Sequence, residues 1–394
     1  MKKSLLIVND LLLGGGVEKL IYDFVWQWHE RYDLTVITMI YEPKARRVLP
    51  PNVHYHSVLP CFASKSGKRL SLFKRAVNKL LDASREKVDF RLVEKYARIV
   101  DRTRFDTVLS MKDGWCMGAV SRLNDIPQKL VWVHTDYNAD TYSIDALRGE
   151  ENTLRCMKIY DHIVCVAEQI KTSIQQTVGD PGNLLVRYNP IRVNEILVKA
   201  QEPVVDIEPF ERENGPLFVT VGRLHFQKGY DLLLEACHML ERDGLSFHVL
   251  IVGAEQPWSV EHKCLYRRQK QLGLKSVRFL GGRSNPYKYM KCADWFISSS
   301  VFEGYSLVSQ EAAVLDVPML LTDCSGVREF LGDSEYGIVM DISVLSIYEN
   351  MKRVIEHPEL REHYREKIME RKKTINFDER IAAIEELFDK DQAE

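Results

Sequence analysis

Short apolar runs alternate with helical patterns along the whole chain, and no other feature constrains the fold as strongly. Runs of this length suit strands that are buried on both faces, and the segments between them are long enough for helices that cross from one parallel strand to the next. The sequence therefore predicts an α/β fold with doubly wound parallel sheets. We expect strands at residues 5–9, 34–40, 107–111, 130–134, 162–167, 217–221, 247–252, 277–280, 295–298 and 319–322.

A boundary between two domains is expected near residue 190. The chain has 394 residues, which is too long for a single hydrophobic core. Asn189 and Pro190 end an apolar segment, and a polar stretch that contains three prolines follows at 201–216. We therefore predict a first domain over 1–190 and a second domain over 191–374.

Composition excludes several classes of protein. The formal net charge is −2, so the molecule as a whole does not attract nucleic acid. No apolar stretch approaches the ~20 residues that cross a bilayer, and we expect a cytoplasmic protein. The eight cysteines include no Cys-x-x-Cys pair and no metal-binding spacing with histidine, so buried free thiols are expected.

Three consecutive glycines, Gly14, Gly15 and Gly16, lie between the first expected strand and a helix that begins near Val17. Glycines there let a ligand approach the backbone, and the exposed amides of the helix can hold a phosphate or leave room for a second substrate. The spacing is not the Gly-x-Gly-x-x-Gly of a dinucleotide site. A plain tight turn is the alternative interpretation.

A second glycine-bounded loop runs from Gly222 to Gly229, after an expected strand. It carries Arg223 and Lys228, two cations whose spacing suits the two phosphates of a diphosphate. Each charge-assisted hydrogen bond to a phosphate contributes about 1.5–3 kcal/mol. A pair of solvated basic side chains is the alternative interpretation.

Two glutamates, Glu303 and Glu311, bracket a turn and the start of a helix just after another expected strand. Gly304 permits a tight turn, and Tyr305 and Ser306 can open the helix with its free amides outward. Glu311 then lies about two turns into the helix, where it can accept hydrogen bonds from hydroxyl groups. Two unrelated glutamates on a solvated helix are the alternative.

Together these segments resemble the retaining glycosyltransferases of family 4, which have the GT-B architecture. The resemblance is close from residue 216 to 340 and looser before that. It implies two Rossmann-like doubly wound domains that face a central cleft, with the last helix, within 375–394, completing the first domain. The matching segments are 14–16, 131–134, 187–190, 222–229, 277–281, 285–287, 293–294, 298–299, 303–311 and 326–329.

The resemblance also implies a role for each residue of the two loops. Arg223 and Lys228 would neutralise the diphosphate of the donor as it leaves. Glu303 would bind sugar hydroxyls, and Glu311 would hold the ribose. The donor site would be completed by the backbone of Gly15, Gly16, Gly222, Gly304, Tyr305 and Ser306.

The N-terminal half supplies the remaining candidates by the same resemblance. His134 would touch the sugar or the leaving phosphate, with a satisfied structural histidine as the alternative. Asp113 and Asp136 are candidates for the acceptor side, or are turn formers. The resemblance implies no cofactor and no metal, because cations and helix amides supply the positive field. An Asp-x-Asp motif occurs only at 389–391, in the polar C-terminal tail.

The implied function is retaining transfer of a hexose or N-acetylhexosamine from a nucleotide sugar. UDP is the first choice of nucleotide, and the acceptor would be a glycan or a lipid-linked sugar in bacterial surface polysaccharide synthesis. A catalytically silent GT-B subunit, which binds a nucleotide sugar or a partner glycosyltransferase, is the alternative. Such a subunit is expected to lose the diphosphate cations or the paired glutamates, and this chain keeps all of them.

A basic segment at 65–104 contains thirteen Lys or Arg and five Asp or Glu. Leu70, Phe73 and Val77 fall on one helical face, while the basic side chains lie largely elsewhere. Such a segment can dock on an anionic membrane surface, where a lipid-linked acceptor is found, and the protein would then lie peripherally on the inner face. A solvated helix packed on the N-terminal sheet is an equal alternative.

Overall fold

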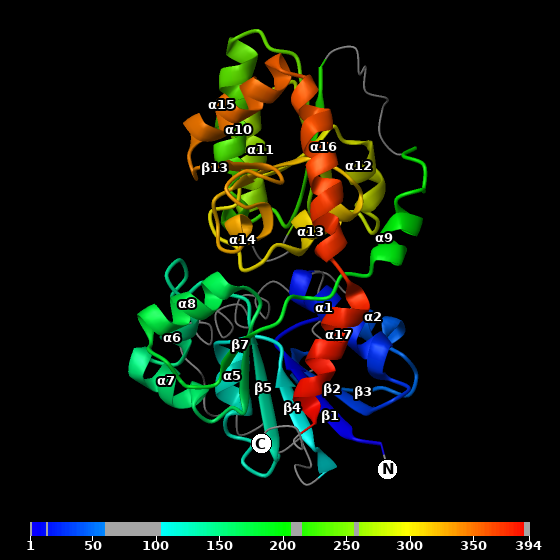
Figure 1. The fold of residues 1–394 in the computed structure, drawn as a ribbon, viewed down its shortest axis with the longest axis vertical. Coiled ribbons are helices and arrows are strands. Elements are labelled where there is room, and N and C mark those ends of the chain that lie inside the picture. The colour runs from blue at the N-terminus through cyan, green and yellow to red at the C-terminus, as the bar shows by residue number, and fades with distance from the viewer. Residues whose placement is uncertain (1, 13–14, 60–103, 206–214, 256–259, 390–394) are drawn as a thin grey trace, which may run out of the picture. The chain divides into compact units, whose positions relative to one another are not determined.

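The chain forms two compact units, each built on one parallel sheet that helices cover (Figure 1). The first unit is Met1–Asn189 with Arg380–Glu394, and the second is Pro190–Glu379. The computed structural model describes residues 2–12, 15–59, 104–205, 215–255 and 260–389.

The N-terminal unit contains a seven-stranded sheet in the order β3-β2-β1-β4-β5-β6-β7, and every pair of neighbours is parallel. The central strands are buried along their whole length, which explains their nearly continuous apolar sequence. The strands are β1 (Ser4–Asn9), β2 (Asp33–Ile40), β3 (His54–Leu59), β4 (Thr107–Ser110), β5 (Gln128–Val133), β6 (His162–Cys165) and β7 (Leu184–Val186). The described helices are α1 (Gly16–Trp28), α2 (Pro43–Val48), α5 (Trp115–Val120), α6 (Tyr142–Ala146), α7 (Glu150–Met157) and α8 (Glu168–Thr177).

The C-terminal unit contains a six-stranded parallel sheet in the order β10-β9-β8-β11-β12-β13. Its core includes Phe218, Leu233, Ile251, Trp295 and Ile347 from the sheet and its covering helices. The strands are β8 (Leu217–Val221), β9 (His248–Val252), β10 (Val277–Gly281), β11 (Trp295–Ser298), β12 (Met319–Thr322) and β13 (Ile338–Met340). The helices are α9 (Val193–Lys199), η3 (Phe226–Lys228), α10 (Tyr230–Arg242), α11 (Glu261–Leu272), α12 (Tyr287–Cys292), α13 (Leu307–Val314), α14 (Val327–Leu331), α15 (Val344–Glu356), α16 (Glu359–Arg371) and η4 (Lys372–Thr374).

Each sheet contains one switch point, a position between two neighbouring strands at which successive strands begin to be added on the opposite side of the sheet. In the N-terminal sheet β2 and β3 lie on one side of β1, and β4 to β7 lie on the other. In the C-terminal sheet the corresponding switch lies between β8 and β11. Ligands of open α/β sheets bind outside the carboxyl ends of the strands at this position. We therefore expect functional side chains directly after β1, β4, β8 and β11.

The last residues of the chain complete the N-terminal unit through α17 (Phe377–Glu385) and η5 (Glu386–Phe388). Phe388 is fully buried, and its ring centroid lies 5.1 Å from that of Trp28. The indole Nε1 of Trp28 donates a hydrogen bond to Glu385 Oε1 at 2.7 Å. Gln128 Nε2 donates to the carbonyl of Leu387, also at 2.7 Å.

The predicted α/β fold with parallel sheets is confirmed, and each expected strand is present with bounds shifted by at most two residues. Three edge strands, β3, β7 and β13, were not expected. β7 and β13 have three residues each, and β3 contains His54, His56 and Ser57. Short or polar edge strands lack the buried apolar run that marks a central strand.

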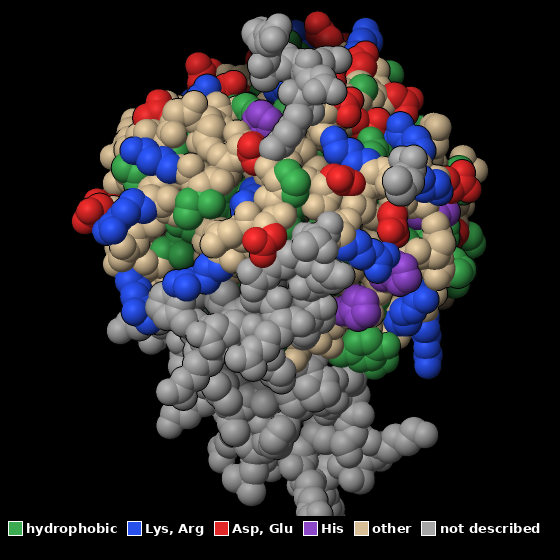
Figure 2. All heavy atoms as spheres, turned by 90° about the horizontal axis from the view of Figure 1, so that it is seen from below, with side chains coloured by type: hydrophobic (Ala, Val, Ile, Leu, Met, Phe, Trp, Pro, Cys, Tyr) green, Lys and Arg blue, Asp and Glu red, His purple; other side chains and the backbone are tan. Residues whose placement is uncertain are grey.

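The described part of the chain has no candidate for a membrane-spanning helix. None of the described helices is both long and apolar enough to cross a bilayer. Figure 2 shows basic and acidic side chains interspersed over the described part of one face. Residues 65–103, nearly all of the basic segment, lie outside the described residues, so docking on a membrane surface stays a prediction.

Candidate functional site

The loop after β8 carries Lys228 to the switch point of the C-terminal sheet. Gly229 has a φ of 54°, and a Cβ at this position would lie 2.0 Å from the carbonyl oxygen of Ser299. Only glycine combines that conformation with so close an approach. Ser299 Oγ also donates a hydrogen bond to the carbonyl of Lys228 at 2.8 Å. The loops that follow β8 and β11 are therefore locked together.

Lys228 forms an ion pair with Glu303, and Ser300 Oγ donates a hydrogen bond to the same carboxylate oxygen at 2.8 Å. The side chains of Lys228 and Glu303 are only 16% and 13% exposed. Charges that are this well shielded from water interact more strongly than charges on the surface. The structure thus brings together two predicted site residues from separate loops, and adds Ser300, to which the sequence assigned no role.

Arg223, the other predicted cation, is exposed on the loop after β8. Within the described part of the chain, the structure records no hydrogen bond or ion pair for its guanidinium group. Its planar group of donors can therefore bind an anion that arrives from solvent.

The helix α13 begins at Leu307, just after the turn at Gly304. Ser306 is the N-cap, and its hydroxyl accepts a hydrogen bond from the backbone N–H of Ser309 at 3.2 Å. The ring of Tyr305 is buried against Phe330, with 6.0 Å between ring centroids. A donor-binding role for Tyr305 therefore rests on its backbone.

Glu311 lies in the second turn of α13 and is buried, with 4% of its surface exposed. The hydroxyl of Tyr287, on α12, donates a hydrogen bond to Glu311 Oε1 at 3.1 Å. A Cβ at Gly326 would lie 2.7 Å from the carbonyl oxygen of Gly304, so the loop before α14 also packs tightly on this turn. The hydrogen bond from Tyr287, which had no predicted role, orients the carboxylate of Glu311.

The C-terminal switch point therefore combines two kinds of recognition group. Lys228, Arg223 and the N-terminus of α13 suit phosphate oxygens. Glu303 and Glu311 are carboxylates that can accept hydrogen bonds from hydroxyl groups. A ligand that carries both phosphates and hydroxyls, such as a nucleotide sugar, matches this combination.

His134 follows β5 in the N-terminal unit, and its ring donates a hydrogen bond to the carbonyl of Met111. Burial, together with the nearby charge of Lys112, lowers the pKa of His134 to about 3, so the imidazole is neutral. Nε2 is buried and has no hydrogen-bond partner among the described residues. A neutral ring in this state presents Nε2 as an acceptor, which suits a hydroxyl group better than a phosphate oxygen.

Asp113 and Asp136 are both buried in the N-terminal unit. Ser143 Oγ donates a hydrogen bond to Asp113 Oδ2 at 2.6 Å, yet burial raises the pKa of Asp113 to about 6. Asp136 Oδ1 accepts a hydrogen bond from the backbone N–H of Asn138 at 2.8 Å, which stabilises a turn. Both carboxylates thus have partners within the protein, and their role on the acceptor side stays a prediction.

The raised pKa of Asp113 gives a testable pH dependence of stability. The carboxyl ionises near pH 4 in the unfolded chain and near pH 6 in the folded protein, so the folded protein binds the extra proton between these values. This stabilisation is fully present below about pH 4 and is lost as the pH rises through about 6; it amounts to about 2–3 kcal/mol. Urea unfolding of wild type and Asp113→Asn should therefore show wild type losing stability relative to the variant over this range. Parallel pH profiles would show that Asp113 ionises normally.

The structure also assembles an ion triad that the sequence did not reveal. Lys112 Nζ lies 2.8 Å from Asp10 Oδ1 and 3.0 Å from Glu18 Oε1. Lys112 follows β4, Asp10 follows β1, and Glu18 lies in the first turn of α1, so this Lys112 triad sits at the N-terminal switch point. One sequence feature could have indicated a role for Glu18. It lies three residues after Gly15, the N-cap of α1, and this position is typical of glutamates that cap a helix.

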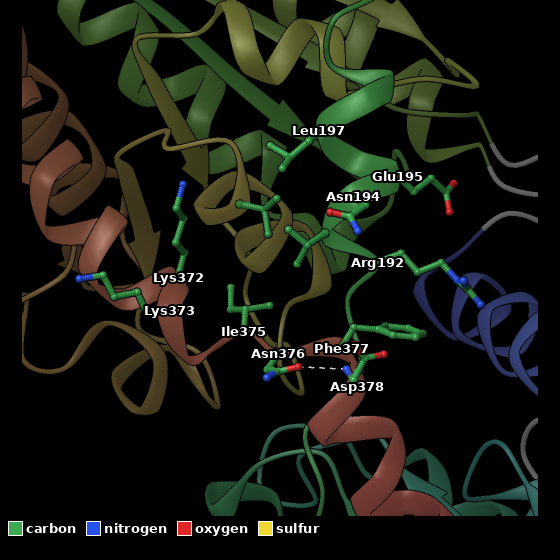
Figure 3. A pocket seen from close by; sticks show the side chains of 12 residues that line it. Arg192, Asn194, Glu195, Leu197, Lys372, Lys373, Ile375, Asn376, Phe377 and Asp378 are labelled. Atoms are coloured by element: carbon green, nitrogen blue, oxygen red, sulfur yellow. Dashed lines mark hydrogen bonds between the residues drawn. The ribbon is translucent and has the colours of Figure 1, made fainter.

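A separate hollow of about 580 Å³ in the C-terminal unit contains none of the predicted site residues. Figure 3 shows it between the start of α9 and the segment that leads from η4 into α17. Arg192 lies over the ring of Phe377, 4.9 Å from its centroid. Basic and acidic side chains both line this hollow, so its charge favours neither anions nor cations. These side chains belong to Arg192, Lys372, Lys373, Glu195 and Asp378.

The fold and the site define a class, the glycosyltransferases of GT-B architecture. Residues 205–371 match the family described as glycosyl transferases group 1, and residues 14–195 match the family described as Glycosyltransferase Family 4. The chain belongs to glycosyltransferase family 4, and the predicted family and architecture are confirmed.

Individual relatives extend this similarity. The N-acetylgalactosamine-N,N'-diacetylbacillosaminyl-diphospho-undecaprenol 4-alpha-N-acetylgalactosaminyltransferase of Campylobacter jejuni is 32% identical over 206 residues. That match covers 52% of this chain and 53% of the relative, or about half the length of each. The structure of HepE from Anabaena in complex with UDP and glucose has a TM-score of 0.73 at 16% identity and covers 98% of both chains. Sucrose-phosphate synthase from Thermosynechococcus elongatus has a TM-score of 0.74 at 14% identity, again over 98% of both chains.

Proposed function

We propose that the protein is a retaining glycosyltransferase that moves a hexose or N-acetylhexosamine from a UDP-linked donor. The acceptor is a glycan or a lipid-linked sugar in bacterial surface polysaccharide synthesis. The cluster at the C-terminal switch point carries the proposal, because Lys228, Arg223, Glu303 and Glu311 combine phosphate-binding with hydroxyl-binding groups.

The proposed chemistry depends on charge that develops as the donor breaks. Departure of the nucleoside diphosphate leaves an oxocarbenium-like sugar and adds negative charge to the phosphate. Lys228 and Arg223 interact with that charge more strongly in the transition state than in the ground state. The acceptor hydroxyl enters on the face that the diphosphate leaves, and its proton passes to a phosphate oxygen.

Glu303 acts in this scheme as a binder of sugar hydroxyls. One of its carboxylate oxygens already pairs with Lys228 and accepts a hydrogen bond from Ser300. Both interactions withdraw electron density and make the carboxylate a poorer nucleophile. This supports hydroxyl binding over attack on the sugar carbon.

Known relatives support the choice of donor and acceptor. The HepE structure contains UDP and glucose, and the name of the Campylobacter relative describes transfer to a sugar on diphospho-undecaprenol. In the N-terminal unit the neutral ring of His134 offers an acceptor for a sugar hydroxyl. We assign Asp113 and Asp136 to the acceptor side.

Two measurements test the proposed function. Thermal shifts against a panel of UDP-, GDP- and ADP-sugars identify the donor, and we expect the largest shift with a UDP-sugar. Release of UDP is then followed with and without candidate acceptors. A protein that binds the nucleotide sugar but never releases UDP when acceptor is added would be a catalytically silent subunit instead.

The proposed mechanism needs no divalent metal, so we expect EDTA to leave turnover unchanged within about twofold. The positive field at the diphosphate comes from Arg223, Lys228 and the helix amides. The described residues also contain no cluster of three His, Cys, Asp or Glu side chains that could hold a metal ion. Initial rates of UDP release with and without EDTA provide the measurement. Complete loss, restored by magnesium or manganese, would contradict this account of diphosphate neutralisation.

We place the protein in the cytoplasm, with peripheral association on the inner face of the membrane. This placement follows from a lipid-linked acceptor and from the basic segment at 65–104, where basic residues exceed acidic ones by eight. Nucleic acid is not among the proposed partners.

A further inference from the structure

The Lys112 triad connects three segments that are far apart in the sequence. Lys112 is 102 residues from Asp10 and 94 residues from Glu18. Its ammonium group contacts Asp10, directly after β1, and Glu18 in the first turn of α1, while its backbone follows β4. The Lys112 side chain therefore links the beginning of α1 to the ends of β1 and β4, the two strands at the switch point.

The carboxylate of Glu18 lies against Gly15. A Cβ at Gly15 would be 2.2 Å from Glu18 Oε2, so the carboxylate occupies the space over the N-cap of α1. A negative charge at a helix N-terminus is stabilised by the helix dipole. The Glu18 carboxylate therefore lies beside the N-cap of α1, where a negative charge is favourable.

The positive charge of Lys112 balances the negative charge of the buried Glu18 carboxylate. The Glu18 side chain is 9% exposed, against 37% for Asp10 and 27% for Lys112. Burial alone would lower the pKa of Lys112, but the charges of Asp10 and Glu18 outweigh it and raise the pKa above its ordinary value. The lysine is therefore charged at neutral pH.

A neighbouring group indicates that this corner of the sheet faces a ligand. His134 follows β5, which pairs with β4, and the charge of Lys112 contributes to the low pKa of its ring. Its Nε2 is buried without a hydrogen-bond partner among the described residues. A buried acceptor such as His134 Nε2, without a partner and next to the paired charges of the Lys112 triad, is expected where a substrate group supplies the missing hydrogen bond.

We propose that Lys112 is a positioning residue for glycosyl transfer: through Asp10 and Glu18 it holds Gly15, Gly16 and the first turn of α1 against β4. The glycine backbone is then presented to the substrate in one fixed geometry. The catalytic consequence rests on the proposed function, whereas the placement of the helix can be tested without any substrate.

The test must separate positioning from simple stabilisation. Removing Lys112 alone leaves the buried Glu18 carboxylate without its cation, and that variant is expected to lose stability for this reason only. Lys112→Met combined with Glu18→Gln removes both charges, so we expect the double variant to melt within about 4 °C of wild type. Lys19→Met, which breaks the ion pair with Asp23 inside α1, is the matched control.

Hydrogen exchange followed by mass spectrometry measures the placement of α1 directly. We expect amides of residues 15–20 to exchange about tenfold faster or more in the double variant, with no change in the control or in the C-terminal unit. Lys112→Arg, which can still bridge Asp10 and Glu18, should keep the protection of wild type. Wild-type exchange at residues 15–20 in the double variant would overturn the proposal.

Steady-state kinetics test the catalytic consequence. We expect turnover of the UDP-sugar to fall by about 30-fold or more in the double variant, while the KM for the donor changes by less than about threefold. Full turnover in a double variant with faster exchange would also overturn the proposal. Absence of transfer in wild type would instead overturn the proposed function, and the exchange result would still decide whether Lys112 holds α1.

Discussion

Lys228→Ala and Arg223→Ala are each expected to lower kcat by about 10²-fold or more, because both side chains act on charge that develops in the transition state. Lys228 lies at the switch point, where Glu303 pairs with its ammonium group in the free protein. Arg223 starts from an exposed position and must close onto the donor. The measurement is the rate of UDP release at saturating donor for each variant.

A matched control distinguishes these two cations from positive charge in general. Lys270 is exposed near the C-terminal end of α11. A helix that crosses between parallel strands runs opposite to them, so its C-terminal end lies at the edge of the sheet away from the strands' carboxyl ends. Lys270→Ala should therefore keep wild-type turnover. Near-wild-type kcat in a folded Lys228→Ala or Arg223→Ala protein would remove the proposed mechanism.

The residues of the C-terminal switch point could be predicted because each lies in a local pattern. Lys228 sits in a glycine-bounded loop and Glu303 precedes a glycine turn, and both follow strands that are buried apolar runs. Their contact spans 75 residues of sequence, but parallel strands end at one edge of a sheet and bring such loops together. The sequence therefore indicated the neighbourhood, while the ion pair and its hydrogen bond from Ser300 required the structure.

The Lys112 triad was not predictable in the same way. Asp10, Glu18 and Lys112 are ordinary charged residues in three separate segments, and no spacing links them. Their contact depends on β4 pairing with β1, which only the order of strands in the sheet determines. The polar edge strand β3 and the three-residue edge strand β7 escaped prediction for a related reason, because neither has the buried apolar run of a central strand and each is recognised by its pairing in the sheet.

The two glutamates are expected to separate donor binding from sugar transfer. Glu311→Ala should weaken the binding of UDP alone by about tenfold or more, because the carboxylate would lose charge-assisted hydrogen bonds to the ribose. Tyr287→Phe is its matched control, since it removes the hydrogen bond to Glu311 Oε1 and keeps the carboxylate. We expect this control to bind UDP within about threefold of wild type.

Glu303→Ala should have the opposite profile, with UDP bound as tightly as in wild type or more tightly and transfer reduced by about 10²-fold. In the free protein the ammonium group of Lys228 is paired with Glu303, and a diphosphate must compete with that carboxylate. Removing the carboxylate releases the cation for the diphosphate but deletes the group that orients the sugar. Isothermal calorimetry with UDP, combined with rates of UDP release from the UDP-sugar, measures both effects. Equal losses of UDP affinity in Glu303→Ala and Glu311→Ala would show that the two carboxylates share one role. UDP carries a ribose but no transferred sugar, so both variants would bind it equally weakly only if both carboxylates contact the ribose.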